Sequence, residues 1–179
     1  MCQYRVWITL RIKNSAKIIN MTRILGIDPG FERLGIAILE KNQGKEHVIF
    51  SECFKTSAGL EFSERLHLIG KEVRRVIKEY KPEVLAIETL FLNTNQKTVM
   101  RVAEARGVVV YEAALAGLQT FEASPPQIKI ATTGYGRANK EQMIKMVKIL
   151  IDVDDSKKSD DELDAIAIAL TAFAHTKLF

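Results

Sequence analysis

Short apolar runs separated by polar, glycine-containing segments dominate the first part of the chain and predict β-strands. Runs at residues 24–27, 34–39 and 47–54 have the length and composition expected for three strands. The connection at residues 41–45 is polar and contains Gly44, as expected for a hairpin between the second and third strands. The pattern therefore predicts an antiparallel meander.

The hydrophobic period changes after this meander. Apolar residues recur every three or four positions between residues 66 and 80, which predicts an amphipathic helix that ends at Lys81–Pro82. A fully apolar run at residues 84–87 indicates a strand buried in a parallel position. A long helix at about 96–116 and a fifth strand at 119–123 are expected to follow.

Two further helices are expected after Pro125–Pro126, which interrupt the pattern. The segments Asn139–Gln142 and Ser159–Glu162 have the spacing of capping boxes, so each marks the start of a helix. The predicted order is β-β-β-α-β-α-β-α-α. This order places the chain in the α/β class.

The first twenty residues do not share this pattern. They carry Arg5, Arg11, Lys13 and Lys17 and no acidic residue, and offer at most a short edge strand. They lack the long apolar stretch and small-residue cleavage site of a secretory signal, although an Arg-bearing presequence remains an alternative. We expect residues 1–20 to be a dispensable extension or a misassigned start. Residues 21–179 are then a single domain, with translation beginning at Met21.

Composition narrows the class of protein. The 179 residues suit one domain, and 26 basic against 22 acidic residues give a charge of +4. The extension accounts for all four charges, so the remainder is neutral and offers no overall attraction for a polyanion. No apolar run approaches the ~20 residues of a membrane span. With only Cys2 and Cys53, a reducing, cytoplasmic setting is expected.

Two carboxylates follow apolar strands at their ends. Asp28 and Glu88 each end such a run, and ligands of open α/β sheets bind at the carboxyl ends of the strands. A charge there is costly unless it is solvated, paired or holding a cation. Taken alone, either residue could equally be the first polar residue of a loop.

A second pair of carboxylates begins the last predicted helix. Asp161 and Asp164 are three residues apart, so they share one helical face, and that face continues into apolar residues. The stripe should pack on the sheet and bring both carboxylates to its edge. Asp160 and Glu162 are expected to point elsewhere and to favour the positive end of the helix dipole. That dipole is also the alternative explanation for the pair.

Together the four carboxylates suit a hard divalent cation. Mg²⁺ prefers oxygen ligands, and two such ions ~4 Å apart can activate an attacking water and stabilise a leaving oxygen. Three histidines without ligand spacing argue against zinc; they are His47, His67 and His175.

Four segments in order carry a specific resemblance. Gly26–Gly30, Ala86–Phe91, Ala105–Gly107 and Asp161–Ala169 resemble the successive signatures of the RuvC family of crossover junction endodeoxyribonucleases, which resolve Holliday junctions. The similarity extends from Met21 to about residue 175. The first segment alone is weak, because actin-like ATPases and several ribonuclease H-like families begin similarly.

The resemblance implies a fold, a reaction and partners. The fold would be ribonuclease H-like, with a mixed five-stranded sheet flanked by helices. The acidic tetrad would be Asp28, Glu88, Asp161 and Asp164, holding two Mg²⁺ ions per active site, with Mn²⁺ able to substitute. The enzyme would be a homodimer that nicks two strands of a four-way DNA junction symmetrically. The branch-migration complex RuvA–RuvB would be its partner.

The resemblance also implies DNA contacts. Phe91 matches an aromatic residue that stacks on an unpaired base, the alternative being a core phenylalanine. Lys129 and Lys140 match basic residues near the scissile phosphate, and Arg137 lies in the same segment.

Small residues on the long helix are a candidate dimer surface. Ala103, Ala105 and Gly107 would permit close helix approach, and packing within one subunit explains them equally well.

Three rival functions remain. One is another ribonuclease H-like nuclease, acting on RNA or on a different DNA structure. Another is an actin-like ATPase or sugar-kinase relative that binds nucleotide phosphate at the Asp28 loop, although such proteins need a second domain. The third is a catalytically silent junction-binding module, which an incomplete tetrad would suggest.

Overall fold

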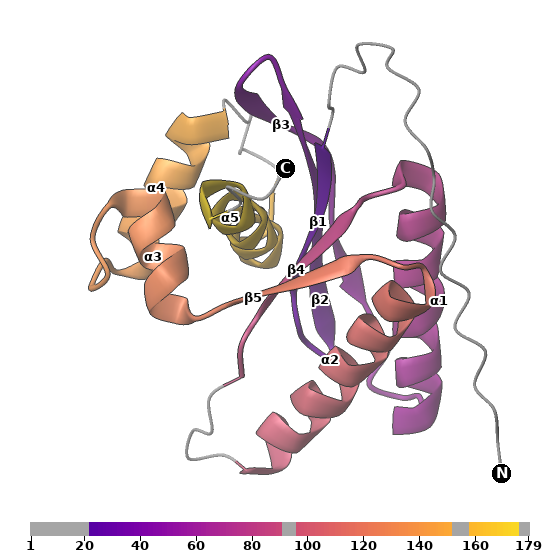
Figure 1. The fold of residues 1–179 in the computed structure, drawn as a ribbon. Coiled ribbons are helices and arrows are strands. Elements are labelled where there is room, and N and C mark those ends of the chain that lie inside the picture. Colours follow the sequence, from indigo (N-terminus) through magenta and orange to yellow (C-terminus); the bar gives the residue numbers. More distant parts are fainter. Residues whose placement is uncertain (1–21, 91–95, 152–157, 176–179) are drawn as a thin grey trace, which may run out of the picture.

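The structure has three layers, with a central β-sheet between two groups of helices (Figure 1). The computed structural model describes residues 22–90, 96–151 and 158–175. The strands are β1 (Thr22–Asp28), β2 (Arg33–Asn42), β3 (Lys45–Lys55), β4 (Val84–Glu88) and β5 (Gln119–Ala123). The helices are α1 (Phe62–Tyr80), α2 (Gln96–Leu115), α3 (Pro125–Thr133), α4 (Lys140–Ile151) and α5 (Asp160–His175). The predicted extension lies outside the described residues, so its dispensability stays a prediction.

The sheet is mixed, as predicted. Its strand order is β3-β2-β1-β4-β5, with β1, β2 and β3 antiparallel and β1, β4 and β5 parallel. The β2–β3 hairpin is tighter than expected, because Asn42 pairs with Lys45 and only Gln43 and Gly44 form the turn. Both turn residues have positive φ angles, of 51° and 84°, as a two-residue hairpin turn with the twist of the strands requires.

One helix was not predicted. Pro125–Pro126, interpreted as a break, instead begin α3. Ser124 caps this helix through a reciprocal capping box with Gln127, and proline is well tolerated in the first helical turn because its missing N–H is not needed there. Gly134, with a φ of 73°, ends it. The described order is therefore β-β-β-α-β-α-β-α-α-α.

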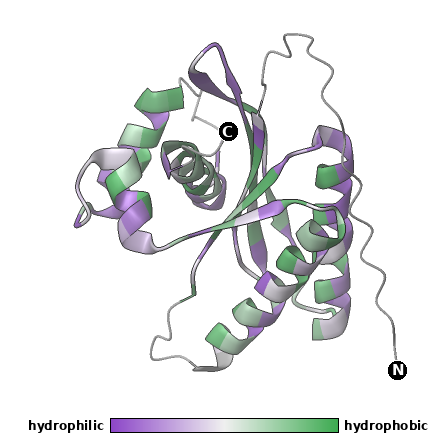
Figure 2. Ribbon diagram, viewed as in Figure 1, coloured by the Kyte–Doolittle hydropathy of each residue, from purple (hydrophilic) through white to green (hydrophobic). Residues whose placement is uncertain are grey.

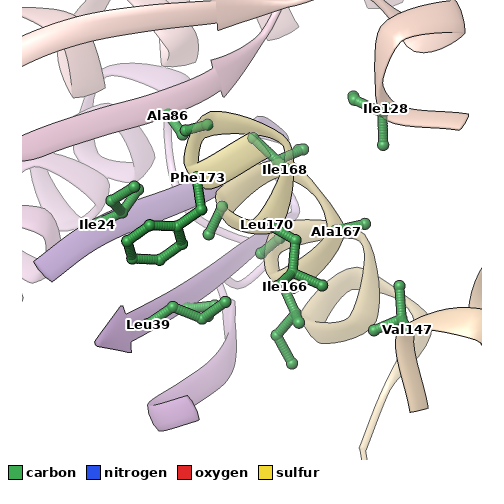
Figure 3. Packing of buried hydrophobic residues seen from close by; sticks show 14 of the residues in the cluster. Ile24, Leu39, Ala86, Ile128, Val147, Ile166, Ala167, Ile168, Leu170 and Phe173 are labelled. Carbon is green, nitrogen blue, oxygen red and sulfur yellow. The ribbon is translucent and has the colours of Figure 1, made fainter. Parts of the chain in front are cut away.

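The two faces of the sheet have separate hydrophobic cores. Helices α1 and α2 cover one face, and α5 covers the other with α3 and α4 packed outside it (Figure 1). Figure 2 shows α1 divided into an apolar side toward the sheet and a polar side, whereas α5 is apolar along most of its length. Because α5 lies between the sheet and α3–α4, it is buried almost all round (Figure 3). None of the described helices is both long and apolar enough to cross a membrane.

Close contact between α5 and the sheet depends on two glycines. A Cβ atom on Gly26 of β1 would collide with the Ala165 carbonyl oxygen and lie 2.8 Å from the Ala169 Cβ. A Cβ atom on Gly35 of β2 would collide with the Asp161 carbonyl oxygen. Glycine at these positions therefore brings the first turns of α5 directly onto β1 and β2.

Candidate active site

Three of the four predicted carboxylates line one pocket at the edge of the sheet. Asp28 ends β1, Glu88 ends the parallel neighbour β4, and Asp164 lies in the second turn of α5. The pocket has a volume of about 230 Å³. Lys129 of α3 and Lys140 of α4 line it as well. The remaining lining residues are apolar: Pro125, Ile128, Met143 and Ile168.

Asp161 lies beside this pocket and is bound to other residues. Its carboxylate accepts hydrogen bonds from the Arg33 guanidinium and from the Cys53 thiol, with Cys53 Sγ 3.3 Å from Oδ2. Its charge still contributes to raising the pKa of Asp28. The structure thus places all four carboxylates in one neighbourhood, with Asp161 tied to β2 and β3.

The acidic side chains of the pocket lie close together and are partly buried. Burial, followed by the charges of Asp164, Glu88 and Asp161, raises the pKa of Asp28 to about 7. Burial also raises the pKa of Glu88, to which the charge of Asp164 adds. The pKa of Asp164 is raised mainly by burial as well, although Lys140 opposes the shift. A cation in the pocket would relieve this accumulated repulsion.

Lys140 is the pocket lysine that pairs with a carboxylate of the pocket. Its Nζ atom lies 3.1 Å from Asp164 Oδ2 and 3.4 Å from Asp160 Oδ2. Burial lowers the pKa of this ammonium, but the hydrogen bond and charge of Asp164 outweigh it, so the pKa is raised and Lys140 remains protonated. The expectation that Asp160 points away from the site is therefore wrong in one respect, because Asp160 shares Lys140 with Asp164.

Glu162 caps α5, as its spacing predicted. Its Oε2 atom accepts the Ser159 backbone N–H at 2.9 Å, and its Oε1 atom accepts the Ser51 hydroxyl at 2.8 Å. Lys158 also approaches the carboxylate, at 3.8 Å. These contacts lower the pKa of Glu162 against the opposing effect of burial and fix the start of α5 to β3. Glu162 therefore supports the helix that carries Asp161 and Asp164.

The residues present fit a hard divalent cation. The donor set of the pocket consists of carboxylate oxygens, which such ions prefer. Asp164 Oδ1 is buried and has no hydrogen-bond partner, so one ligand atom is free to bind an ion. As the side chains stand, no group of three acidic, histidine or cysteine residues in the described part of the chain is arranged to hold a metal. Arg33 and Lys140 occupy oxygens of Asp161 and Asp164 instead.

The other predicted site residues lie in different places. Arg137 is exposed and does not line the pocket, whereas Lys129 and Lys140 do. Phe91 lies outside the described residues. On α2, Ala105 is buried in the core, while Ala103 and Gly107 are exposed. The small residues of this helix are thus divided between core packing and a free surface.

Sequence reasoning missed Arg33 and Cys53. Arg33 begins β2 and is 128 residues from its partner Asp161, and Cys53 reaches the same carboxylate from β3. No local pattern marks either residue. Gly35 of β2 pairs with Cys53 of β3, and the backbone of Asp161 lies against Gly35. Knowledge of these two contacts would have placed Cys53 near Asp161.

Solved structures with little sequence similarity establish the fold. The yeast mitochondrial Holliday junction resolvase Ydc2, 16% identical, superposes with a TM-score of 0.65 over 87% of this chain and 79% of its own. A fowlpox virus Holliday junction resolvase, 14% identical, gives 0.54 over 86% of this chain and 98% of its own. These similarities concern the fold alone and agree with the predicted ribonuclease H-like fold.

Closer relatives identify the family. The family model described as crossover junction endodeoxyribonuclease RuvC matches residues 24–172. The RuvC of Caldanaerobacter subterraneus subsp. tengcongensis is 42% identical over 83% of this chain and 90% of its own length. The RuvC of Thermosipho melanesiensis is 41% identical over 87% and 99%. The chain belongs to the RuvC family, metal-dependent crossover junction endodeoxyribonucleases that resolve Holliday junctions.

A relative of known structure agrees with this assignment. The Thermus thermophilus RuvC, solved in complex with a Holliday junction substrate, is 32% identical. It superposes with a TM-score of 0.80 over 86% of this chain and 94% of its own. The predicted family and fold are confirmed.

Proposed function

We propose that this chain cleaves four-way DNA junctions at the pocket of Asp28, Glu88 and Asp164, together with Asp161. The observation that carries the proposal is the composition of one pocket: three carboxylates from separate elements, two lysines, and a buried carboxylate oxygen without a partner. Such a site combines ligands for a divalent cation with groups that attract a phosphodiester. The Thermus relative, solved with a Holliday junction, supports this substrate.

The four carboxylates would hold two Mg²⁺ ions, with Mn²⁺ able to substitute. When bound, these ions supply an activated water and stabilisation of the leaving oxygen. The strand ends of β1 and β4 hold Asp28 and Glu88 in place, and the first turns of α5 hold Asp161 and Asp164. The chain's contribution is therefore a rigid set of oxygens in a half-buried pocket.

The two lysines of the pocket bind and orient the substrate. Lys129 of α3 and Lys140 of α4 both line the pocket. Lys140 keeps its proton, so its ammonium can donate hydrogen bonds to a phosphate oxygen beside the carboxylates. These contacts supply affinity and positioning without reading sequence. Arg137, exposed on the segment between these helices, would contact the DNA backbone farther from the cut.

The proposed enzyme acts as a homodimer. Two-fold symmetry presents equivalent active sites to strands of like polarity, so the two nicks are symmetric and can be sealed by ligase. The exposed Ala103 and Gly107 of α2 are the proposed contact between subunits.

Phe91 would stack on an unpaired base at the junction centre. The branch-migration complex RuvA–RuvB and a cytoplasmic location complete the proposal.

Amide substitutions test the carboxylates one at a time. Asp28→Asn, Glu88→Gln, Asp161→Asn and Asp164→Asn should each abolish Mg²⁺-dependent cleavage and preserve junction binding, because an amide keeps the shape and loses the charge that holds the cation. Binding is measured by gel shift in a chelator, and cleavage in single turnovers of a synthetic four-way junction. A linear duplex and an RNA–DNA hybrid serve as competing substrates.

Glu83→Gln is the matched control. Glu83 precedes β4, at the opposite end of the strand from Glu88, and its side chain is exposed. This variant should bind and cleave as the unmodified protein does. Full cleavage by any of the four amide variants, or faster cleavage of the hybrid than of the junction, would contradict the proposal.

A further inference from the structure

Arg106 of α2 contacts the C-terminal end of β4 from the face of the sheet that is opposite to α5. Its Nε atom donates a hydrogen bond to the Glu88 carbonyl oxygen at 3.1 Å. Its Nη2 atom lies 2.6 Å from Glu122 Oε2 on β5, an ion pair without ideal hydrogen-bond alignment. Only 18% of the Arg106 side chain is exposed. One guanidinium therefore connects α2 with the ends of β4 and β5.

These contacts fix the peptide group that follows Glu88. Arg106 binds the carbonyl of the Glu88–Thr89 peptide, and the Thr89 N–H donates to the Ala123 carbonyl oxygen at 2.9 Å. Both polar atoms of this peptide are therefore held. Because the peptide plane sets the direction of the Cα–Cβ bond, the two hydrogen bonds also set where the Glu88 carboxylate enters the pocket.

The charge of Arg106 is neutralised away from the pocket. Glu122 pairs with the guanidinium, and the contact with Glu88 goes to the backbone, not to the carboxylate. The effect of Arg106 on Glu88 is therefore geometric. A planar guanidinium can make both contacts at once, whereas the point charge of a lysine cannot reproduce the fork.

We propose that Arg106 is a positioning residue for Glu88 and that it tightens divalent-cation binding without touching the ion or the DNA. The proposal rests on the assignment of Glu88 to the cation site. It gives a role to Arg106, because core packing explains its neighbour Ala105 but not the contact of Arg106 with the strand end.

The test compares two arginine–glutamate ion pairs in the full-length protein, each with one partly or fully buried member. Arg106→Gln removes the contacts with Glu88 and Glu122. Arg74→Gln is the control, because Arg74 of α1 makes a paired interaction with Glu112 of α2, at 2.9 and 2.7 Å, remote from the pocket. Mn²⁺ binding to the DNA-free protein is measured by electron paramagnetic resonance, and thermal unfolding by circular dichroism.

The two variants should separate stability from positioning. Arg106→Gln should weaken Mn²⁺ binding by at least ~10-fold, as loss of a residue that orients a ligand does. It should also raise the Mg²⁺ concentration needed for half-maximal cleavage while leaving junction binding in chelator unchanged. Arg74→Gln should lower the melting temperature and leave Mn²⁺ affinity unchanged. Arg106→Lys should fall between Arg106→Gln and the unmodified protein.

Unchanged Mn²⁺ affinity in folded Arg106→Gln would overturn the proposal, as would an equal loss of affinity in Arg74→Gln. If Arg106→Gln does not fold, Arg106→Lys is judged by the same criteria. Glu88→Gln distinguishes the two proposals: if it loses Mn²⁺ binding while Arg106→Gln does not, only the role of Arg106 is wrong. Normal Mn²⁺ binding and cleavage by Glu88→Gln would instead overturn the cation site, and the role of Arg106 with it.

Discussion

The two faces of the sheet are packed in different ways. The face under α1 and α2 is filled mainly by large aliphatic side chains; from the strands these are Leu25, Ile27, Leu34, Ile36, Ile38, Leu85 and Ile87. The face under α5 is rich in alanine: Ala37, Ala86, Ala123, Ala165, Ala167, Ala169 and Ala172. Gly26 and Gly35 also lie against α5. Large residues keep helices at a distance, whereas small residues let α5 approach the backbone of the sheet.

This difference separates stability from geometry. Full burial of a large aliphatic side chain contributes ~1.5–3 kcal/mol, so the α1–α2 face supplies much of the hydrophobic stabilisation without contributing a carboxylate to the site. The α5 face contributes less area per residue but determines where Asp161 and Asp164 lie relative to Asp28. Substitutions on the two faces should therefore affect different measured quantities.

The largest effect is expected from Gly35→Ala. Its Cβ atom would collide with the Asp161 backbone and lie 3.1 Å from the Asp28 Cβ, so the start of α5 must shift. A displacement of ~1 Å at a catalytic group can cost ~100-fold in rate, and overpacking costs ~1–3 kcal/mol of stability. Single-turnover junction cleavage and urea unfolding measure the two effects. The control is Gly59→Ala, whose Cβ atom would meet only Ser57 Oγ, at 3.7 Å, and which should leave both quantities nearly unchanged.

Truncation on the other face should reduce stability alone. Ile69 of α1 is fully buried, and Ile69→Ala should lower the free energy of unfolding by ~2–5 kcal/mol through lost burial and a cavity. Cleavage per folded molecule should stay near that of the unmodified protein, measured at a temperature where both are folded. A rate loss comparable to that of Gly35→Ala would show that the two faces are not separable in this way.

Metal-free protein should become less stable as the pH rises toward the pKa of Asp28. The pKa of Asp28 is raised from 3.8 to about 7, so its neutral form stabilises the fold fully below about pH 4. That contribution is lost as pH rises to 7 and beyond, by at most about 4 kcal/mol. Urea unfolding in chelator measures the free energy of unfolding at pH 5 and pH 8. Its decrease between these pH values should be smaller for Asp28→Asn than for the unmodified protein. Equal declines would contradict the assigned shift.

The smallest effect on folding and cleavage is expected from a deletion that touches neither face of the sheet. Deletion of residues 1–20 should leave folding and junction cleavage nearly unchanged, because every strand and helix described begins after them. Circular dichroism and the junction cleavage assay compare the truncated and full-length chains. Insoluble or inactive truncated protein would show that the segment contributes to one of the cores.

Elements with a strong local signal were predicted well. Residues close together in sequence determine the apolar stripe of α1, the apolar run of β4 and the capping boxes of α4 and α5. The α3 helix was missed because the prolines were read as a break, although Ser124 and Gln127 already had capping-box spacing. At the end of α4, Leu150 is half exposed and its neighbour Ile151 is buried, because only contact with the rest of the fold selects between adjacent apolar residues.

The proximity of the carboxylates was predictable where strand ends and helical spacing determine it. Asp28, Glu88 and Asp164 meet because β1 and β4 are parallel neighbours and α5 packs on β1. The partners of the acidic residues at the start of α5 were not predictable, because each pairing depends on tertiary distance. Arg33 reaches Asp161 across 128 residues, and Lys140 reaches Asp160 from another helix. Local sequence contains no information on such pairings.

The central position of α5 also constrains the order in which the chain can acquire activity during translation. Domains tend to fold from the N-terminal side as they are synthesised, and β1 to β5 with α1 and α2 all precede α5 in sequence. The α1–α2 face can therefore assemble on a nascent chain. The proposed cation pocket cannot, because Asp161 and Asp164 emerge last of the four carboxylates. A chain that stops before α5 consequently lacks two of the four carboxylates of the proposed site.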